Sequence, residues 1–197
     1  MIAILDYGAG NLRSVQNTLD KIGAEYELVR DASGLERATK IILPGVGHFG
    51  QMMRALDAMQ VRQALRNRIQ SGVPFLGICL GLQALFESSE EAPETTGLGL
   101  FDGTIHRFPA GARVPHMGWN EIEPRTDSKL LANLAPHPYL YFAHSYFAPV
   151  NCATAATCTY MLPYTAVLES ANVYGVQFHP EKSGPLGLRI VQNFVEL

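Results

Sequence analysis

Short apolar runs alternate with amphipathic stretches through the N-terminal half of the chain. The runs have the length and continuous hydrophobicity of strands that are buried on both faces of a parallel sheet. Between them, apolar residues recur at helical spacing, and Asn11 stands where it can cap the first helix. This alternation predicts a doubly wound parallel sheet flanked by helices. We expect strands at Ile2–Leu5, Glu25–Val29, Ile41–Leu43 and Val73–Ile78, and helices at Leu12–Ile22, Phe49–Met59, Arg62–Gln70 and Leu82–Glu87.

The pattern changes in the C-terminal half, where strands follow one another with short turns between them. We expect these strands to extend the sheet in antiparallel fashion and to add a small β layer. No linker, repeat or compositional break divides the chain, so residues 1–197 are predicted to form one α/β domain with an open, mostly parallel sheet. The strands are expected at Gly97–Phe108, Trp119–Glu123, Tyr139–Phe147, Ala153–Tyr160, Tyr164–Glu169 and Val173–Gln177, and the helices at Ser128–Leu134 and Pro185–Val195.

The composition is that of a globular protein with a substantial core, because 47% of the residues are hydrophobic. A net charge of -3 and the lack of any basic run argue against a nucleic-acid partner. No apolar stretch is long enough to span a membrane, and the N-terminus has neither a basic leader nor a cleavage site. These features predict a cytoplasmic protein.

Cysteine usage and glycine spacing bear on cofactors. The sequence has 3 cysteines, an odd count without metal-ligand spacing, which fits a reducing compartment and predicts no metal site. Cys152 and Cys158 are expected to fill apolar positions in a strand region. The glycines of Gly8–Gly10 complete no phosphate-binding motif, so we expect a strand-to-helix turn there and no cofactor.

Cys79 lies within Gly77–Gly81, between an expected strand and an expected helix. Small residues around a nucleophile at such a tight turn are typical of a nucleophile elbow. The positive end of the helix dipole favours a thiolate there, and the N–H of Leu80 points to the same place, where it can hold an oxyanion. The alternative is a buried structural cysteine beside a helix start.

A second glycine-rich segment, Pro44–Gly47, follows the third expected strand. It exposes backbone N–H groups at the carboxyl edge of the sheet, where open α/β sheets bind their ligands. A β-branched residue between two glycines also suits a peptide flip. The alternative is a plain turn into the next helix.

His179 follows the last expected strand, and Glu181 stands two residues beyond it. Alternation in an extended segment places these two side chains on one side, so Glu181 can fix the tautomer of the imidazole. His179 can then take the proton of Cys79 and later protonate a leaving amine. The alternatives are a core or surface histidine and a solvated carboxylate, and His48 and His144 are competing bases.

Six motifs occur in order along nearly the whole chain. They are Asp6–Leu12, Leu43–Phe49, Gly77–Gln83, Pro115–Asn120, His144–Tyr146 and Gln177–Ser183. Together they resemble the class I (triad) glutamine amidotransferases, whose fold is a flavodoxin-like α/β sheet. The first and fourth motifs narrow the resemblance to the glutaminase subunits of imidazole glycerol phosphate synthase. Tyr160–Tyr164 departs from the usual pattern of that family, in what we expect to be a hairpin.

The resemblance implies a Cys-His-Glu glutaminase. Cys79 would form a γ-glutamyl thioester and release ammonia, with His179 as base and then acid and Glu181 orienting it. The oxyanion would be held by backbone N–H groups of Leu80 and of Val46 or Gly47. The residues implied to bind glutamine are Gly45, Gln83, Glu91, Ser145 and Tyr146.

The resemblance also implies a partner, a separate (βα)8-barrel cyclase that forms a heterodimer with this chain. Ammonia would pass through a channel to the cyclase, which makes imidazole glycerol phosphate and aminoimidazole carboxamide ribotide in histidine biosynthesis. We expect the isolated subunit to be nearly inactive until the cyclase and its ligand bind. The only tryptophan is chemically suited to anchor such an interface. The residues implied to face the cyclase are Asn11, Pro115, Met117, Gly118, Trp119, Asn120 and Lys182.

Three other functions stay open at this point. The chain could be a triad amidotransferase that feeds another acceptor such as the precursor of anthranilate. It could be a stand-alone cysteine hydrolase that acts on γ-glutamyl conjugates, or a non-catalytic regulatory module with the same fold. A partner pull-down, activity without a partner, and labelling of the thiol by a glutamine analogue would distinguish these functions.

Overall fold

The computed structural model describes residues 1–125 and 127–197. Its helices are α1 (Leu12–Ile22), α2 (Ala32–Arg37), α3 (Phe49–Ala58), α4 (Arg62–Gln70), α5 (Leu80–Gln83) and α6 (Gly184–Glu196), with a 3-10 turn, η1 (Pro180–Lys182). The strands of the main sheet are β1 (Ile2–Leu5), β2 (Tyr26–Val29), β3 (Lys40–Gly45), β4 (Phe75–Cys79), β8 (Glu123–Pro124), β11 (Thr154–Tyr160), β12 (Leu162–Ser170) and β13 (Val173–Val176).

Within the described residues the main sheet has eight strands, in the order β2-β1-β3-β4-β13-β12-β11-β8. The strands from β2 to β13 pair in parallel. The remaining three join in antiparallel fashion on one side. This arrangement confirms the predicted fold class, an open and mostly parallel sheet with added antiparallel strands.

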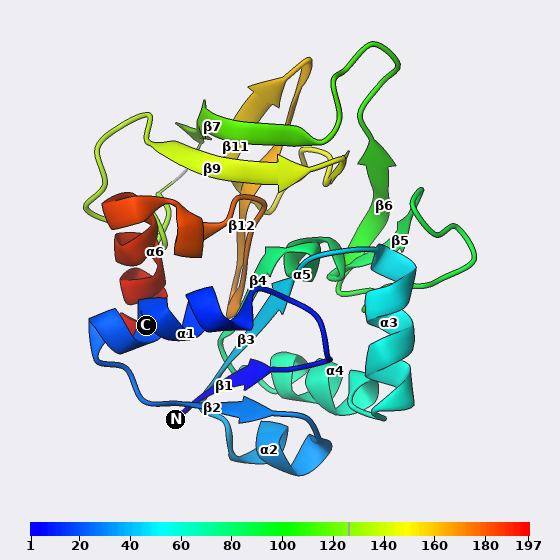
Figure 1. The fold of residues 1–197 in the computed structure, drawn as a ribbon, viewed down its shortest axis with the longest axis vertical. Coiled ribbons are helices and arrows are strands. Elements are labelled where there is room, and N and C mark those ends of the chain that lie inside the picture. Colours follow the sequence, from blue (N-terminus) through cyan, green and yellow to red (C-terminus); the bar gives the residue numbers. More distant parts are fainter. Residues whose placement is uncertain (126) are drawn as a thin grey trace.

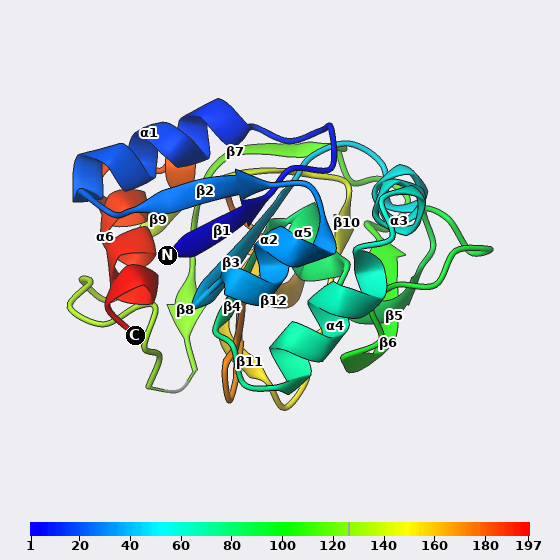
Figure 2. The same cartoon turned by 90° about the horizontal axis from the view of Figure 1, so that it is seen from below.

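Helices cover both faces of this sheet, with α1 and α6 on one face and α2, α3 and α4 on the other (Figures 1 and 2). The alternation of side chains along β1 shows why. Ile4 is fully buried in the cluster that contains Leu19 of α1, whereas the next residue, Leu5, belongs to the cluster that contains Leu65 of α4. Successive strand residues point to opposite faces, so each parallel strand supplies apolar side chains to both layers.

Two smaller sheets stand beside the main one. One contains β5 (Phe86–Ser89), β6 (Phe101–Arg107) and β10 (Tyr146–Phe147), and the other pairs β7 (His116–Glu121) with β9 (Tyr139–His144). In Figure 1 the β7–β9 pair crosses above the carboxyl ends of the central strands. The backbone N–H of His179 donates to the carbonyl of Tyr141 at 2.8 Å, which ties β9 to this edge.

Two expected helices are wrong in whole or in part. Ser128–Leu134 forms hydrogen-bonded turns and no helix, because the side chain of Asn193 donates to the carbonyls of Leu130 and Ala132 and the backbone at Asn133 is left-handed (φ 62°). The helix expected at Leu82–Glu87 ends at Gln83, and the chain enters β5 at Phe86, which pairs with β6.

Other boundaries also differ from the expected ones. The sequence analysis missed α2, which begins where the side chain of Asp31 accepts a hydrogen bond from Gly34 N. Asn11 occupies the N-cap position of α1, but its side chain makes no capping hydrogen bond within the described chain. Cys152 lies exposed in a turn rather than in an apolar strand position. The strand expected at Trp119–Glu123 begins earlier, at His116, and ends at Glu121 as β7, and the strand expected at Tyr139–Phe147 is divided into β9 and β10.

Candidate active site

Cys79 stands at the sharp turn between β4 and α5. Its backbone has φ 54° and ψ −105°, a conformation that L-residues rarely adopt and that is typically held at functional sites. Two glycines permit this turn. A Cβ on Gly81 would collide with the carbonyl of Leu43, and one on Gly77 would collide with the carbonyl of Gly81. The close approach of α5 to β3 therefore depends on these residues lacking side chains.

His179 follows β13 and faces the same cavity as Cys79. Its Nδ1 is 2.8 Å from Oε1 of Glu181, and the two side chains are only 4% and 2% exposed. Burial by itself lowers the pKa of His179, but interactions with Cys79 and Glu181 outweigh burial and raise the pKa to about 10. The imidazole therefore holds its proton at neutral pH. Because Glu181 occupies Nδ1, Nε2 is the ring nitrogen that remains for Cys79.

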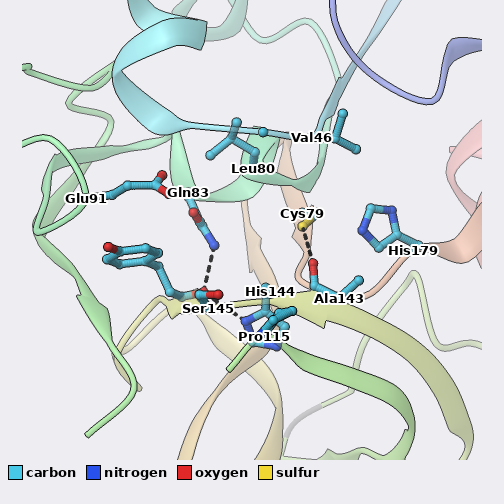
Figure 3. Close-up of a pocket in the computed structure, with 12 residues that line it drawn as sticks. Val46, Cys79, Leu80, Gln83, Glu91, Pro115, Ala143, His144, Ser145 and His179 are labelled. Carbon is cyan, nitrogen blue, oxygen red and sulfur yellow. Dashed lines mark hydrogen bonds between the residues drawn. The ribbon is translucent and has the colours of Figure 1, made fainter. Parts of the chain in front are cut away.

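A cavity of about 160 Å³ opens in front of Cys79 (Figure 3). Its size suits a small polar molecule better than a drug-sized ligand. Segments far apart in the sequence contribute to its wall. The lining residues are Val46, Gly47, Cys79, Leu80, Gln83, Glu91, Pro115, Ala143, His144, Ser145, Tyr146 and His179. Gly45, the other residue expected to bind glutamine, is buried beneath the cavity, where an added Cβ would lie 2.6 Å from the N of Gly81.

The glycine-rich segment after β3 is held by Tyr7. The N–H of Val46 donates to the hydroxyl of Tyr7 at 3.4 Å, and this hydroxyl lies 3.5 Å from the carbonyl of Val46. Burial raises the pKa of Tyr7 to about 12, so the hydroxyl stays protonated and can both donate and accept. In this conformation Tyr7 therefore occupies the Val46 N–H. Gly47 follows with φ 95°, a region that favours glycine.

Gln83 and Glu91 present acceptor oxygens to the cavity. Nε2 of Gln83 donates to the carbonyl of Tyr146 at 2.8 Å and to Oε1 of Gln177 at 3.2 Å. Both amide hydrogens are thus used, and Oε1 of Gln83 remains as an acceptor. Oε2 of Glu91 accepts from the N–H of Phe49 at 2.7 Å. Acceptors of this kind suit a cationic group such as an ammonium.

His144 lines the cavity, but its neighbours engage both ring nitrogens. Nδ1 is 2.8 Å from the carbonyl of Tyr146, so this nitrogen carries the hydrogen. Nε2 lies 3.2 Å from the hydroxyl of Tyr164 and 3.3 Å from Nδ1 of His116. Burial lowers the pKa of His144 to about 3. The ring is therefore neutral and directed away from Cys79, whereas His179 lines the same cavity as Cys79.

His48, the other competing base, serves a structural contact. Its Nδ1 accepts from the N–H of Gly50 at 3.1 Å and caps the start of α3.

All three cysteines are free, and Cys158 is buried in β11, where burial raises its pKa to about 11. In residues 1–125 and 127–197, no group of three or more His, Cys, Asp or Glu side chains could hold a metal ion. No helix in these ranges has both the length and the apolarity to cross a bilayer.

The residues expected to face a partner lie mostly on β7 and its surroundings. Trp119 and Met117 are 56% and 64% exposed, so the tryptophan is not a core residue. Trp119 packs edge-on against Tyr141, whose ring lies 5.8 Å from Nζ of Lys182. The other members of the set, Asn11, Pro115, Gly118 and Asn120, are also at least partly exposed. An exposed aromatic and methionine surface next to the cavity mouth is typical of an interaction site.

Two contacts of the site involve residues that the sequence analysis did not single out. Nε2 of Gln177 lies 3.5 Å from Sγ of Cys79, and the hydroxyl of Tyr7 binds Val46. Gln177 precedes His179 by two residues in an extended segment, so the rule that placed Glu181 also places Gln177 on the same side. For Tyr7 the only signal in the sequence was its position just beyond the first expected strand. If that strand lies next to the third expected strand, Tyr7 comes close to the segment that contains Val46.

This combination of a strained cysteine at a strand-to-helix turn, a buried His-Glu pair and a small polar cavity agrees with the sequence family. Residues 3–197 match the family described as Glutamine amidotransferase class-I. The chain therefore belongs to the class-I glutamine amidotransferases. Solved structures agree on the fold, including a "Crystal structure of glutamine amidotransferase" (TM-score 0.78, 20% identity, covering 99% of this chain and 97% of that one). The "Structure of PurLQS from Thermotoga maritima" has a TM-score of 0.77 at 19% identity, with the same coverage of the two chains.

Within this family, the chain is homologous over its full length to subunits of one synthase. A protein of Methanothermobacter thermautotrophicus named Imidazole glycerol phosphate synthase subunit HisH is 49% identical, covering 100% of this chain and 98% of the relative. The protein of the same name from Desulfitobacterium hafniense is 45% identical, covering 98% of this chain and 93% of the relative. A third, from Xanthomonas axonopodis pv. citri, is 46% identical over 100% of this chain and 97% of the relative.

Proposed function

We propose that this chain is the glutaminase subunit of an imidazole glycerol phosphate synthase, in histidine biosynthesis. The names of its homologues support the choice of synthase. The observation that carries the proposed chemistry is the meeting of Cys79, His179 and Glu181, from two distant segments, at one small cavity. Apolar clusters on both faces of one sheet support the proposal that residues 1–197 form a single amidotransferase domain.

In the proposed reaction, the sulfur of Cys79 attacks the side-chain amide carbon of glutamine. The raised pKa of His179 supports a resting pair in which the imidazole already carries the proton. His179 gives this proton to the leaving nitrogen, so ammonia departs and a γ-glutamyl thioester remains. Water then attacks the thioester while His179 takes its proton, and glutamate leaves as the resting pair of thiolate and protonated imidazole is restored. Glu181 holds the ring in the tautomer that both steps need.

The tetrahedral intermediates carry a negative oxygen that needs two donors. The N–H of Leu80 is one candidate, because Leu80 begins α5 and lines the cavity. The second donor is the N–H of Val46 or Gly47. Since Tyr7 occupies the Val46 N–H, this segment has to change on activation if Val46 is the donor. Loss of one such donor typically costs on the order of a hundredfold in rate.

The polar cavity wall supports binding of the amino acid head group of glutamine. Oε1 of Gln83 and the carboxylate of Glu91 would accept hydrogen bonds from the α-ammonium group. Backbone at Ser145 and Tyr146 would hold the other side of the head group, and Gly45 keeps the floor of the cavity close to α5. Charge-assisted hydrogen bonds of this kind are stronger than neutral ones.

We propose a (βα)8-barrel cyclase as the partner in a heterodimer. The exposed surface on β7, with Trp119 and Met117 at its centre and Lys182 at its side, supports docking over the mouth of the cavity. Such docking would let ammonia pass directly through a channel, whereas ammonia released into neutral water is protonated and loses its nucleophilicity. We also propose a cytoplasmic location, which the three free cysteines support.

The test uses the complex with the cyclase from the same organism. For the variant Cys79→Ala we expect loss of glutamine-dependent synthesis of imidazole glycerol phosphate and retention of ammonia-dependent synthesis. The matched control is Cys152→Ala, which removes an exposed thiol outside the cavity and should leave both activities intact. Loss of ammonia-dependent synthesis with Cys79→Ala, or retention of glutamine-dependent synthesis, would contradict the proposal.

A further inference from the structure

Gln177 is fully buried next to the proposed nucleophile, yet none of the roles described so far involves its side chain. It follows Val176, which is level with Ile78 in the parallel pairing of β13 and β4, so Gln177 comes level with Cys79. Its Nε2 lies 3.5 Å from Sγ of Cys79, within the range of an N–H hydrogen bond to sulfur. A buried amide is costly unless its polar atoms have partners, and here one partner is the reactive sulfur.

The hydrogen-bond partners also fix which way round the amide lies. The carbonyl of Tyr146 can only accept, so Gln83 has to turn its NH2 group toward it at 2.8 Å. The same NH2 group lies 3.2 Å from Gln177, which therefore has to present its oxygen to Gln83. The NH2 group of Gln177 is then the one that faces Cys79. The orientation of the donor at the sulfur is thus set by a chain of contacts that begins at a backbone carbonyl.

We infer that Gln177 is a positioning residue for the glutaminase step: its Nε2 donates to Sγ of Cys79, holds the sulfur in place and stabilises the thiolate. This inference deepens the proposed function and rests on it for the link to glutamine. A hydrogen bond from a neutral donor to an anion is stronger than one to a neutral thiol. The contact therefore favours ionisation of the sulfur. Gln177 does not line the cavity, so it acts through Cys79 and not on the substrate.

The experiment measures how fast iodoacetamide alkylates Cys79 in the isolated chain at pH 7 and at pH 10, with mass spectrometry of the Cys79 peptide. Gln177→Met keeps the length of the side chain and removes the donor. We expect labelling about tenfold slower than wild type at pH 7, and equal rates at pH 10, because thiols in general are ionised at that pH. Gln51→Met, on the exposed side of α3, is the matched control and should label at the wild-type rate.

Glutamine hydrolysis by the complex with the cyclase gives a second readout. In Gln177→Met, kcat should fall about tenfold while KM for glutamine stays close to the wild-type value, because no lining residue is replaced and Gln83 keeps its shorter hydrogen bond to the carbonyl of Tyr146. Gln177→Glu, which is nearly isosteric, should also label more slowly at pH 7, since a carboxylate repels the thiolate. It serves as the test variant if the methionine variant does not fold.

Two results would overturn the inference. One is a wild-type labelling rate at pH 7 in a folded variant, and the other is an equal loss of rate at pH 7 and pH 10, which would mean altered access to the sulfur. If the labelling difference is found but the wild-type complex does not hydrolyse glutamine, the proposed function fails while the contact between Gln177 and the thiolate stands.

Discussion

The neutral, buried state of His144 leads to a prediction about acid stability. Burial among Phe108, Phe142 and Tyr164 opposes a charge on this ring, and His116 lies 3.3 Å away and would repel one if it were charged. The pKa of His144 is lowered from 6.5 to about 3 in the folded protein. His144 therefore becomes protonated near pH 6.5 in the unfolded chain, but only near pH 3 in the folded chain. Stability is present above pH 6.5 and is lost as the pH falls through this window.

The size of the loss follows from the two pKa values of His144. Each unit between them is worth about 1.4 kcal/mol once the pH lies below both values. At pH 5 only the upper part of the window has been crossed, so we expect His144 to contribute a loss of about 2 kcal/mol relative to pH 8. Such a loss is a large fraction of the stability of an ordinary domain.

The assay is urea unfolding at pH 8 and pH 5, with the free energy of unfolding taken from linear extrapolation. His144→Asn keeps a group that can donate to the carbonyl of Tyr146 but does not titrate. The difference in stability between pH 8 and pH 5 should be about 2 kcal/mol smaller in this variant than in the wild type. Phe142→Leu, a non-titrating change in the same cluster, should keep the wild-type difference. Equal pH dependence in the wild type and His144→Asn would refute a neutral, buried imidazole.

Three further predictions concern the segment Pro44–Gly47, the turn at Cys79 and the exposed surface on β7. Tyr7→Phe removes the hydroxyl that holds Val46 N–H, so glutamine hydrolysis by the isolated chain should rise roughly fivefold, the worth of one hydrogen bond; no rise in a glutamate-release assay would show that Tyr7 does not restrain the loop. Gly81→Ala places a Cβ against the carbonyl of Leu43 and should cost several kcal/mol in urea unfolding, whereas wild-type stability would mean that the elbow can relax. Trp119→Ala should weaken cyclase binding by at least about thirtyfold in calorimetry while Cys79 labels normally, and unchanged affinity would place the interface elsewhere.

The architecture was predictable where local pattern and packing agree. The buried runs at β1, β3 and β4 are apolar on both faces because helices cover both faces, so their hydrophobicity alone marks them as parallel strands. The prediction failed where a distant group overrides local preference. The segment Ser128–Leu134 has helical spacing, but the side chain of Asn193 donates to the carbonyls of Leu130 and Ala132, and Asn133 takes a positive φ. No local signal reveals a partner about sixty residues away.

In the site, too, local features could be predicted from the sequence, and contacts between distant segments could not. Cys79, His179 and Glu181 could be chosen from the sequence because a tight glycine turn and an i, i+2 relation are local features. The contact between Gln177 and the sulfur depends on the strand order, since β13 has to lie next to β4 for their ends to meet. The direction of that hydrogen bond depends further on a backbone carbonyl from β10.

These contacts also explain why two amide side chains, from α5 and from the end of β13, are buried in the interior of the protein. Gln83 and Gln177 are 4% and 0% exposed, and a pair of apolar residues of the same size would avoid the cost of burying two amides. Gln177 is not needed to hold β13 beside β4, because these two strands are already joined by their ladder. What the amides add is direction: one presents an oxygen to the cavity, and the other presents a donor to the sulfur. The proposed glutaminase site has to bind an ammonium group and stabilise a thiolate, and under that proposal the chemistry explains the buried polar pair better than stability does.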